Sequence, residues 1–260
     1  MVAGEPAPLE RDELLNADPP STPAADSDRL EEIARDYDPS DQTRHFDYWL
    51  KRLQTKSITP WLRGRNTLEL GCATGELTSL LEPLVARYDV VEGSQHNIDV
   101  ASARVPGANF TLSMWEDFEP QRAYSDIVLC NAIEHVSDPA SLLVRVRDWL
   151  EPDGRVHIVV PNGYSLHRLV GVEMGFLPEP LFLSPGDVAQ GHVRNYTVDT
   201  LLAEIRGSGM RVANLQPVFL KLLSNPQMLG WEWSLIEAIH NVAQRFPEHG
   251  AEIYAVAERA

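Results

Sequence analysis

Two carboxylates and a pair of glycines stand where the sequence changes from a strand-like to a helix-like pattern. The stretch LELGCATGELT, residues 68–78, places Glu69 before Gly71, and Gly75 opens an apolar helical pattern. Glu92 ends the next apolar run, about twenty residues after the first glycine. Glycines at such a turn let the backbone approach a nucleotide, and an acid at the end of the following strand accepts hydrogen bonds from ribose hydroxyls. These residues predict a nucleoside site.

The spacing of the glycines and the position of Glu69 argue against a dinucleotide. The chain has G-x-x-x-G where dinucleotide-binding folds have G-x-G-x-x-G. A carboxylate beside a pyrophosphate is electrostatically unfavourable, whereas it favours a ligand that has a positive centre and no phosphate. S-adenosylmethionine is a nucleoside of this kind, and NAD is not.

A site of this kind needs the edge of a parallel sheet, and the pattern after Trp61 predicts one. Short apolar runs alternate with helical segments, which is typical of parallel strands covered on both faces. We expect strands at residues 66–70, 88–92, 109–113, 126–131, 155–161, 211–219 and 252–258. Helices are expected at residues 75–86, 95–104, 139–150, 197–209 and 231–245, with Gly154 in a turn and a long irregular connection from Pro161 to Asn195.

The N-terminal part differs from the rest in composition and periodicity, and it divides into two segments. Residues 1–26 are rich in Ala, Pro, Asp and Glu without periodicity, which predicts a disordered or loosely held arm. Residues 27–60 carry helical spacing and several aromatic side chains, which either pack in the core or form a lid over a site. Residues 61–260 are expected to form the main domain, with an insert at about 161–196 as the candidate acceptor site. The aromatic side chains in question are Tyr37, Phe46, Tyr48 and Trp49, and Tyr37 is a candidate substrate contact.

Composition excludes several classes of partner. The formal charge is −16 and no dense basic cluster occurs, so nucleic acid and anionic membranes are not expected partners. No apolar run approaches the ~20 residues of a membrane span, and the start lacks a secretory pattern, so we expect a cytoplasmic protein. Two cysteines without metal-like spacing predict neither a disulfide framework nor a metal site.

Six motifs in order give the chain a resemblance to the class I S-adenosylmethionine-dependent methyltransferases. Over about residues 40–260 they read LELGCATGELT, VVEGSQ, MWEDFE, DIVLCNAIEHVSDPASLL, WLEPDGRVHIVVPN and GHVRNYTVDTLL. Within that family the likeness is to the broad bacterial group that includes ubiquinone-biosynthesis-like and natural-product enzymes. The resemblance implies an α/β, Rossmann-like, doubly wound seven-stranded sheet whose last strand is antiparallel.

The resemblance also implies positions for the cofactor. Glu69 would lie near the methionine amino group, and Glu92 would hold the ribose. Adenine would rest against Met114 or Trp115, with Glu116 or Asp117 nearby. The remaining positions implied to surround the cofactor are Gly71, Cys72, Ala73 and Gly75 under the methionine, Gly93 and Ser94 beside the adenosine, and Asn131 and Ala132 on the methyl-donor side.

Candidate acceptor residues follow the fourth strand and end the long connection. His135 stands just past the strand and is the candidate base for a hydroxyl or amine acceptor, although a structural hydrogen bond would explain it equally. His192, Arg194 and Tyr196 alternate before a helix start and are expected to share a face that contacts the acceptor. His167 and Arg168 are weaker candidates.

These observations predict methyl transfer to an oxygen or nitrogen of a small molecule, in natural-product metabolism such as antibiotic biosynthesis. The alternatives are a quinone-pathway phenol, or a carboxyl or peptide group, as the acceptor. A non-catalytic nucleoside-binding or scaffolding subunit is the alternative from another class, and a dehydrogenase fits least well because of the glycine spacing. The identity of the acceptor and the oligomeric state stay open.

Overall fold

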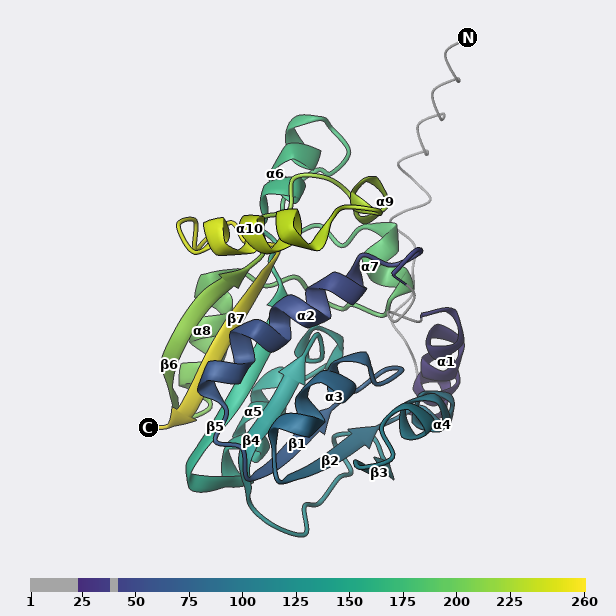
Figure 1. Cartoon of the computed structure of the whole chain (residues 1–260), viewed down its shortest axis with the longest axis vertical. Helices are drawn as coiled ribbons and strands as arrows, with labels where there is room; N and C mark the ends of the chain where they lie inside the picture. Colours follow the sequence, from purple (N-terminus) through teal and green to yellow (C-terminus); the bar gives the residue numbers. More distant parts are fainter. Residues whose placement is uncertain (1–22, 38–41) are drawn as a thin grey trace.

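A seven-stranded sheet, with helices packed on both faces, forms the centre of the molecule (Figure 1). The computed structural model describes residues 23–37 and 42–260. The strand order is β3-β2-β1-β4-β5-β7-β6. The strands are β1 Asn66–Leu70, β2 Arg87–Glu92, β3 Asn109–Leu112, β4 Tyr124–Cys130, β5 Leu150–Pro161, β6 Met210–Val218 and β7 Glu252–Arg259.

The direction of the strands decides what meets at each edge of the sheet. Strands β1 to β5 run parallel to one another, whereas β7 runs antiparallel to both β5 and β6. The carboxyl ends of the parallel strands therefore share one edge, and β7 begins there, with Glu252 opposite Pro161. The doubly wound sheet with an antiparallel last strand, expected from the sequence, is confirmed.

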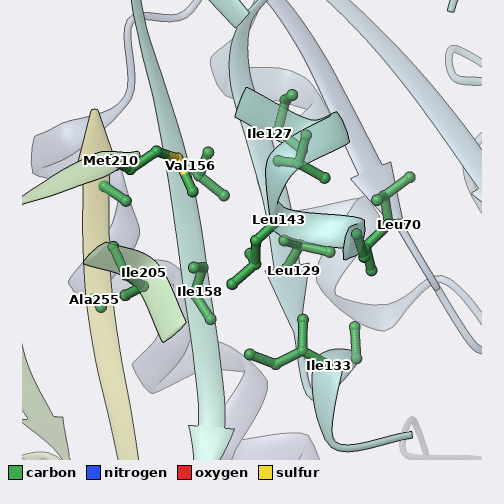
Figure 2. Close-up of a cluster of buried hydrophobic side chains, with 14 of the residues drawn as sticks. Leu70, Ile127, Leu129, Ile133, Leu143, Val156, Ile158, Ile205, Met210 and Ala255 are labelled. Carbon is green, nitrogen blue, oxygen red and sulfur yellow. The ribbon is translucent and has the colours of Figure 1, made fainter. Parts of the chain in front are cut away.

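Helices cover both faces of the sheet and leave its central strands, such as β1 and β4, buried on both sides. In one core cluster, Leu143 and Ile205 pack against strand residues such as Leu129 and Ile158 (Figure 2). Burial on both faces explains the nearly continuous apolar runs of the strands. The helices are α1 Pro23–Asp36, α2 Asp47–Ile58, α3 Glu76–Leu81, α4 Gln95–Arg104, α5 Pro139–Asp148, α6 Leu166–Glu173, α7 Pro185–Ala189, α8 Val198–Gly207, α9 Asn225–Met228 and α10 Trp233–Ala243, with 3-10 turns η1 Thr59–Trp61, η2 Glu82–Leu84 and η3 Ile133–His135.

The connection after β5 is not irregular, contrary to the expectation. It contains α6 and the short α7, whose capping box pairs Ser184 with Asp187. These helices were missed because the first spans only eight residues and the second five, too short for a clear apolar period. Gly154 was also misplaced: it lies within β5 because that strand begins at Leu150.

Other boundaries shift by a few residues. The helix expected at 75–86 ends at Leu81 and continues as η2, where Pro83 lies in the first turn. Helix α1 begins at Pro23, inside the segment expected to be an arm, and the rest of that segment, residues 1–22, lies outside the described residues. Among the described helices, none combines the length and the apolar character that a membrane span requires.

Candidate active site

A cavity of about 520 Å³ opens at the edge of the sheet where the parallel strands end. The loops after β1, β2 and β4 form its floor, and side chains of α1, α2 and the segment around α7 form other parts of its wall. Most of the residues predicted to bind cofactor or acceptor line this one cavity: Tyr37, Glu69, Gly71, Cys72, Ala73, Glu92, Gly93, Met114, Trp115, Glu116, Asn131, His135 and His192.

Glu92 holds the glycine loop in its conformation. Its Oε2 accepts hydrogen bonds from the backbone N–H groups of Cys72 (3.1 Å) and Ala73 (3.2 Å), and its Oε1 accepts one from Ser94 N–H (3.0 Å). Burial nevertheless raises the pKa of this carboxyl, against the effect of those donors. The loop that would lie under a nucleoside is therefore fixed by the acid that was predicted to hold its ribose.

Gly71 is required by both the backbone and its surroundings. Its φ is +80°, and a Cβ there would lie 2.8 Å from Cζ2 of Trp115. Ala73, with φ +46°, occupies the same left-handed region although it has a side chain. Such strain persists where the surrounding structure fixes it, commonly at binding sites.

Glu69 lies at the floor of the cavity and is only 1% exposed. Its Oε2 accepts hydrogen bonds from the hydroxyls of Thr78 (2.6 Å) and Tyr88 (3.1 Å). Burial raises its pKa to about 7, and the two hydroxyls oppose that rise. A cationic ammonium group bound beside it would favour the charged carboxylate.

Gly93 and Met114 border the part of the cavity next to β2, and α1 closes over them. A Cβ on Gly93 would lie 2.7 Å from Leu30 Cδ2 and 3.0 Å from Met114 Sδ. Glu31 lies beside Leu30 on α1, and its carboxylate accepts a hydrogen bond from the backbone N–H of Gln95 (2.6 Å). Helix α1 therefore packs on the β2–α4 turn and covers this end of the cavity, as Figure 1 shows beside α4.

Three predicted cofactor residues do not line the cavity and have local structural contacts instead. The hydroxyl of Ser94 caps α4 by accepting from Asn97 N–H (3.1 Å). Gly75 permits helix packing, because a Cβ there would lie 2.9 Å from Cβ of Ala101. Ala132 is buried in the core, 1% exposed.

Asn131 is the centre of a polar cluster that sequence reasoning missed. It has φ +56° directly after β4, and its Oδ1 accepts from Lys51 Nζ and Gln54 Nε2, both at 2.9 Å. Gln54 and Asn131 also donate to the carboxylate of Glu252. One signal was available: an antiparallel last strand begins at the edge where parallel strands end, so its first residue, Glu252, faces the site.

His135 and His192 meet in the wall of the cavity. Their ring centroids are 4.9 Å apart in an edge-to-face arrangement. Burial, followed by the neighbouring ring of His192, lowers the pKa of His135 to about 4, and burial also lowers the pKa of His192. Two neutral imidazoles therefore stand where the acceptor was expected.

Arg194 and Tyr196, predicted to share a face with His192, do not line the cavity. Arg194 donates to the carbonyl oxygens of Val136 (2.5 Å) and Ser137 (3.0 Å) and so holds the loop after β4. The hydroxyl of Tyr196 donates to Glu204 (2.8 Å) and its ring is buried in the core. Alternation predicted a common face, but both side chains already have partners within the fold.

The predicted substrate contact Tyr37 does border the cavity, with its hydroxyl donating to Asp47 (3.1 Å). The other N-terminal aromatics differ in environment. Phe46 is fully buried against Phe219, with ring centroids 5.4 Å apart, and Trp49 stacks on Trp233 at 5.5 Å. Core packing therefore accounts for Phe46, whereas Tyr37 faces the cavity.

One cluster of the described residues has donor atoms arranged as a metal could use them. A ligand atom from each of Glu134, His135 and His192 lies within 4.8 Å of the other two. Glu134 is fully buried, and among described groups none donates a hydrogen bond to either of its carboxylate oxygens. Burial raises its pKa to about 8. His135 and His192 were both predicted at the acceptor, but their distance of 57 residues along the chain did not indicate a shared cluster with Glu134.

A family model described as a methyltransferase domain matches residues 31–215, most of the chain. That match covers the glycine loop, both acids and the loop after β4. The chain belongs to the class I S-adenosylmethionine-dependent methyltransferases. The sequence-based recognition of this family and of a methyltransferase enzyme is thereby confirmed.

Relatives of this methyltransferase carry related names. This chain is 28% identical over 185 residues to a ubiquinone biosynthesis O-methyltransferase of Cereibacter sphaeroides. The alignment covers 66% of this chain and 68% of that protein. The chain is 30% identical over 111 residues to a trans-aconitate 2-methyltransferase of Methylobacterium radiotolerans, covering 41% of this chain and 42% of that protein. The methyltransferase thus matches less than half the length of the latter relative.

Solved structures show the same fold at low sequence identity. The N-methyltransferase NodS of Bradyrhizobium japonicum, in complex with S-adenosyl-L-homocysteine, aligns with a TM-score of 0.58 and 12% identity over 89% of this chain and 98% of that one. A methyltransferase in complex with the Haloferax volcanii Trm112 activator aligns with a TM-score of 0.60 and 14% identity over 89% and 96%. The fold class expected from the sequence is confirmed by these likenesses.

Proposed function

We propose that this methyltransferase moves the methyl group of S-adenosylmethionine to an oxygen or nitrogen of a small molecule held beside His135 and His192. The observation that carries the proposal is the continuity of the cavity. The glycine loop, both acids and the two histidines all line this one cavity. A donor and an acceptor bound there would lie side by side in one enclosed space.

The described residues fit the cofactor. The left-handed Gly71 lets the Trp115 ring pack where a Cβ would clash, Glu92 orders the loop, and Glu69 supplies a carboxyl at the cavity for an ammonium group. When bound, S-adenosylmethionine supplies an activated methyl group on a sulfonium. The protein contributes position and exclusion of water, which can supply much of the barrier reduction in a displacement at carbon.

At the acceptor end, the residues are suited to orient a polar molecule and handle its proton. His135 and His192 are neutral, so a hydroxyl or amine can donate a hydrogen bond to either ring. The sequence-based proposal that His135 is the base would be worth about 10²–10⁴-fold in rate. Because the two rings are in contact, we expect His192 to share in this role rather than to act on binding alone.

Lys221 favours an acceptor with an anionic group, which extends the proposal to carboxylate-bearing phenols or acids. It lines the cavity, and no described carboxylate lies within ion-pair distance of its ammonium group. Burial lowers its pKa, and the more distant charge of Asp47 opposes this shift. A bound anion would restore the charge balance of this ammonium group.

A small acceptor agrees with the enclosure of the site and the charge of the chain. The cavity of about 520 Å³ must hold both cofactor and acceptor, and the formal charge of −16 disfavours nucleic acid and anionic membrane. The names of the relatives suggest phenols of quinone pathways or tricarboxylates as acceptors. We propose natural-product metabolism and a cytoplasmic location on the sequence argument alone.

The test combines binding and turnover. Calorimetry should show that S-adenosyl-L-homocysteine binds and NAD does not. Mass spectrometry should then detect transfer of a labelled methyl group to members of a panel of phenols, amines and carboxylic acids. With an accepted substrate, His135→Ala should lower the turnover rate by about 10²-fold at unchanged cofactor affinity. Binding without turnover on any panel member would favour the scaffolding alternative, and NAD binding alone would refute the proposal.

A further inference from the structure

We infer that Glu134, His135 and His192 form a site for one divalent transition-metal ion beside the acceptor. This inference rests on the proposed function only for the role of the ion, and the site itself can be tested without turnover. The ligand atoms of the three side chains lie within 4.8 Å of one another. They come from η3 and from the segment after α7, which are 57 residues apart.

The unsatisfied atoms of the cluster are the observation that separates it from an ordinary polar group. Neither oxygen of Glu134 accepts a direct hydrogen bond among the described residues, although the nearby Asn131 side chain acts to lower the pKa of this carboxyl. Nδ1 of His192 is buried without a hydrogen bond and lies 3.9 Å from Oδ1 of Asp187. A buried carboxyl without direct hydrogen bonds is destabilising. A bound cation between the three side chains would satisfy these atoms at once.

The segments that carry the ligands are fixed relative to each other. Val193 follows His192 in the chain, and its backbone N–H donates to the carbonyl oxygen of Glu134 (3.0 Å). Arg194 spans the same two segments through the carbonyl oxygens of Val136 and Ser137. Val193 and Arg194 therefore hold the two ligand-bearing segments together. Direct contact with the acceptor is not needed to explain these residues.

The geometry requires a contraction of the cluster. Two ligand atoms that bind one ion at about 2.1 Å and at a tetrahedral angle are about 3.4 Å apart. The most separated pair, within 4.8 Å, would approach by up to about 1.4 Å, through rotation of the side chains. Two imidazole nitrogens and one carboxylate oxygen suit Zn²⁺, Fe²⁺, Co²⁺ or Mn²⁺, whereas Mg²⁺ and Ca²⁺ prefer oxygen ligands alone.

The role follows from where the cluster opens. His135 and His192 line the cavity and Glu134 lies behind them, so free coordination positions would face the acceptor. With an ion bound, the two imidazoles would be its ligands and would no longer act as bases, and the ion itself would make an acceptor hydroxyl lose its proton to solvent more readily. Its oxygen lone pair then forms the new bond to the methyl carbon, and the electrons of the broken carbon–sulfur bond stay on sulfur to give neutral S-adenosylhomocysteine.

The experiment titrates Co²⁺ into the full chain after dialysis against a chelator, following visible d–d absorption. We expect one equivalent to bind. Glu134→Gln and His192→Ala should each weaken binding by at least the 10–100-fold that loss of an outer-shell partner costs. His249→Ala is the matched control, because the ring of this histidine hydrogen-bonds the carbonyl oxygen of Tyr164 and His249 is not among the residues that line the cavity; this variant should bind Co²⁺ normally.

Calorimetry with S-adenosyl-L-homocysteine on the same variants separates failures of folding and of function from failure of the metal site. Normal cofactor affinity in a variant that no longer binds Co²⁺ supports the site. The inference is overturned if the folded wild-type protein takes up no Co²⁺ at millimolar concentrations, or if Glu134→Gln and His192→Ala bind it as tightly as wild type. Methyl transfer that persists fully in chelator would leave the proposed function standing and remove the role of the ion.

Discussion

Replacement of Glu92 by Gln should weaken cofactor binding because it loosens the glycine loop. Both carboxylate oxygens of Glu92 are used: one accepts from Cys72 and Ala73, and the other accepts from Ser94. A Gln side chain has one acceptor oxygen, so its NH₂ group must face at least one backbone N–H donor. The variant keeps the size of the side chain and removes its charge and one acceptor.

The magnitude follows from the bonds that are lost. A hydrogen bond to a charged group contributes about 1.5–3 kcal/mol, and at least one of those to Glu92 is lost while the others become neutral. If the lost hydrogen-bond energy reduces the binding free energy of the nucleoside by the same amount, the dissociation constant of S-adenosyl-L-homocysteine should rise roughly 10- to 150-fold. Hydrogen bonds from ribose hydroxyls, where formed, would add to this effect.

Calorimetry measures the affinity, and chemical denaturation measures the free energy of unfolding of the same variant. Glu232→Gln is the control, because it replaces an exposed acid at the start of α10, away from the cavity. We expect the control to bind as wild type does. If Glu92→Gln binds the cofactor with unchanged affinity, then Glu92 neither orders the loop nor contacts the ribose.

Three further predictions concern the loop, the N-terminal helix and the core. Gly71→Ala should lower cofactor affinity at least about 10-fold, measured by calorimetry, because φ is +80° and the Cβ would meet Trp115. Deleting residues 1–36 should weaken cofactor binding because α1 lines the cavity, whereas the matched deletion of residues 1–22 should not; equal affinities would reduce α1 to a surface helix. Asp126→Asn should destabilise the fold at pH 7 by about 1.5–3 kcal/mol, and denaturation should show the difference narrowing below about pH 4. Burial opposes the shift, yet hydrogen bonds from neighbours including His157 lower the pKa of Asp126, so its stabilisation is present above the unfolded pKa and lost as pH falls; a difference that grows in acid would contradict this.

The sheet and the cofactor loop could be predicted because their signals are local. A glycine turn between an apolar strand and a helix is set by nearby backbone geometry, and Glu92 ends the adjacent strand. The parallel strands were recognisable because burial on both faces makes them continuous apolar runs. Gly75 and Ser94 show the limit of this reasoning: both belong to the predicted motif, but the contacts that the structure describes for them are helix packing and capping.

The residues around the acceptor could not be predicted in the same way. Contacts between segments far apart in the sequence position them, and hydrophobic periodicity does not reveal such contacts. Asn131 meets Lys51 and Glu252 from 80 and 121 residues away. Arg194 was placed on the acceptor by the alternation of polar residues, but its guanidinium group binds carbonyl oxygens of the loop after β4. Polar residues in a long connection have many partners available, and only the fold decides among them.

The central claim is that one cavity holds the cofactor and the acceptor side by side. A crystal structure of the protein with S-adenosyl-L-homocysteine tests it most directly. We predict the ribose beside Glu92, the methionine amino group beside Glu69, and the sulfur directed toward the end of the cavity that His135 and His192 line. A cofactor bound elsewhere, or bound with its sulfur turned away from the two histidines, would contradict the account.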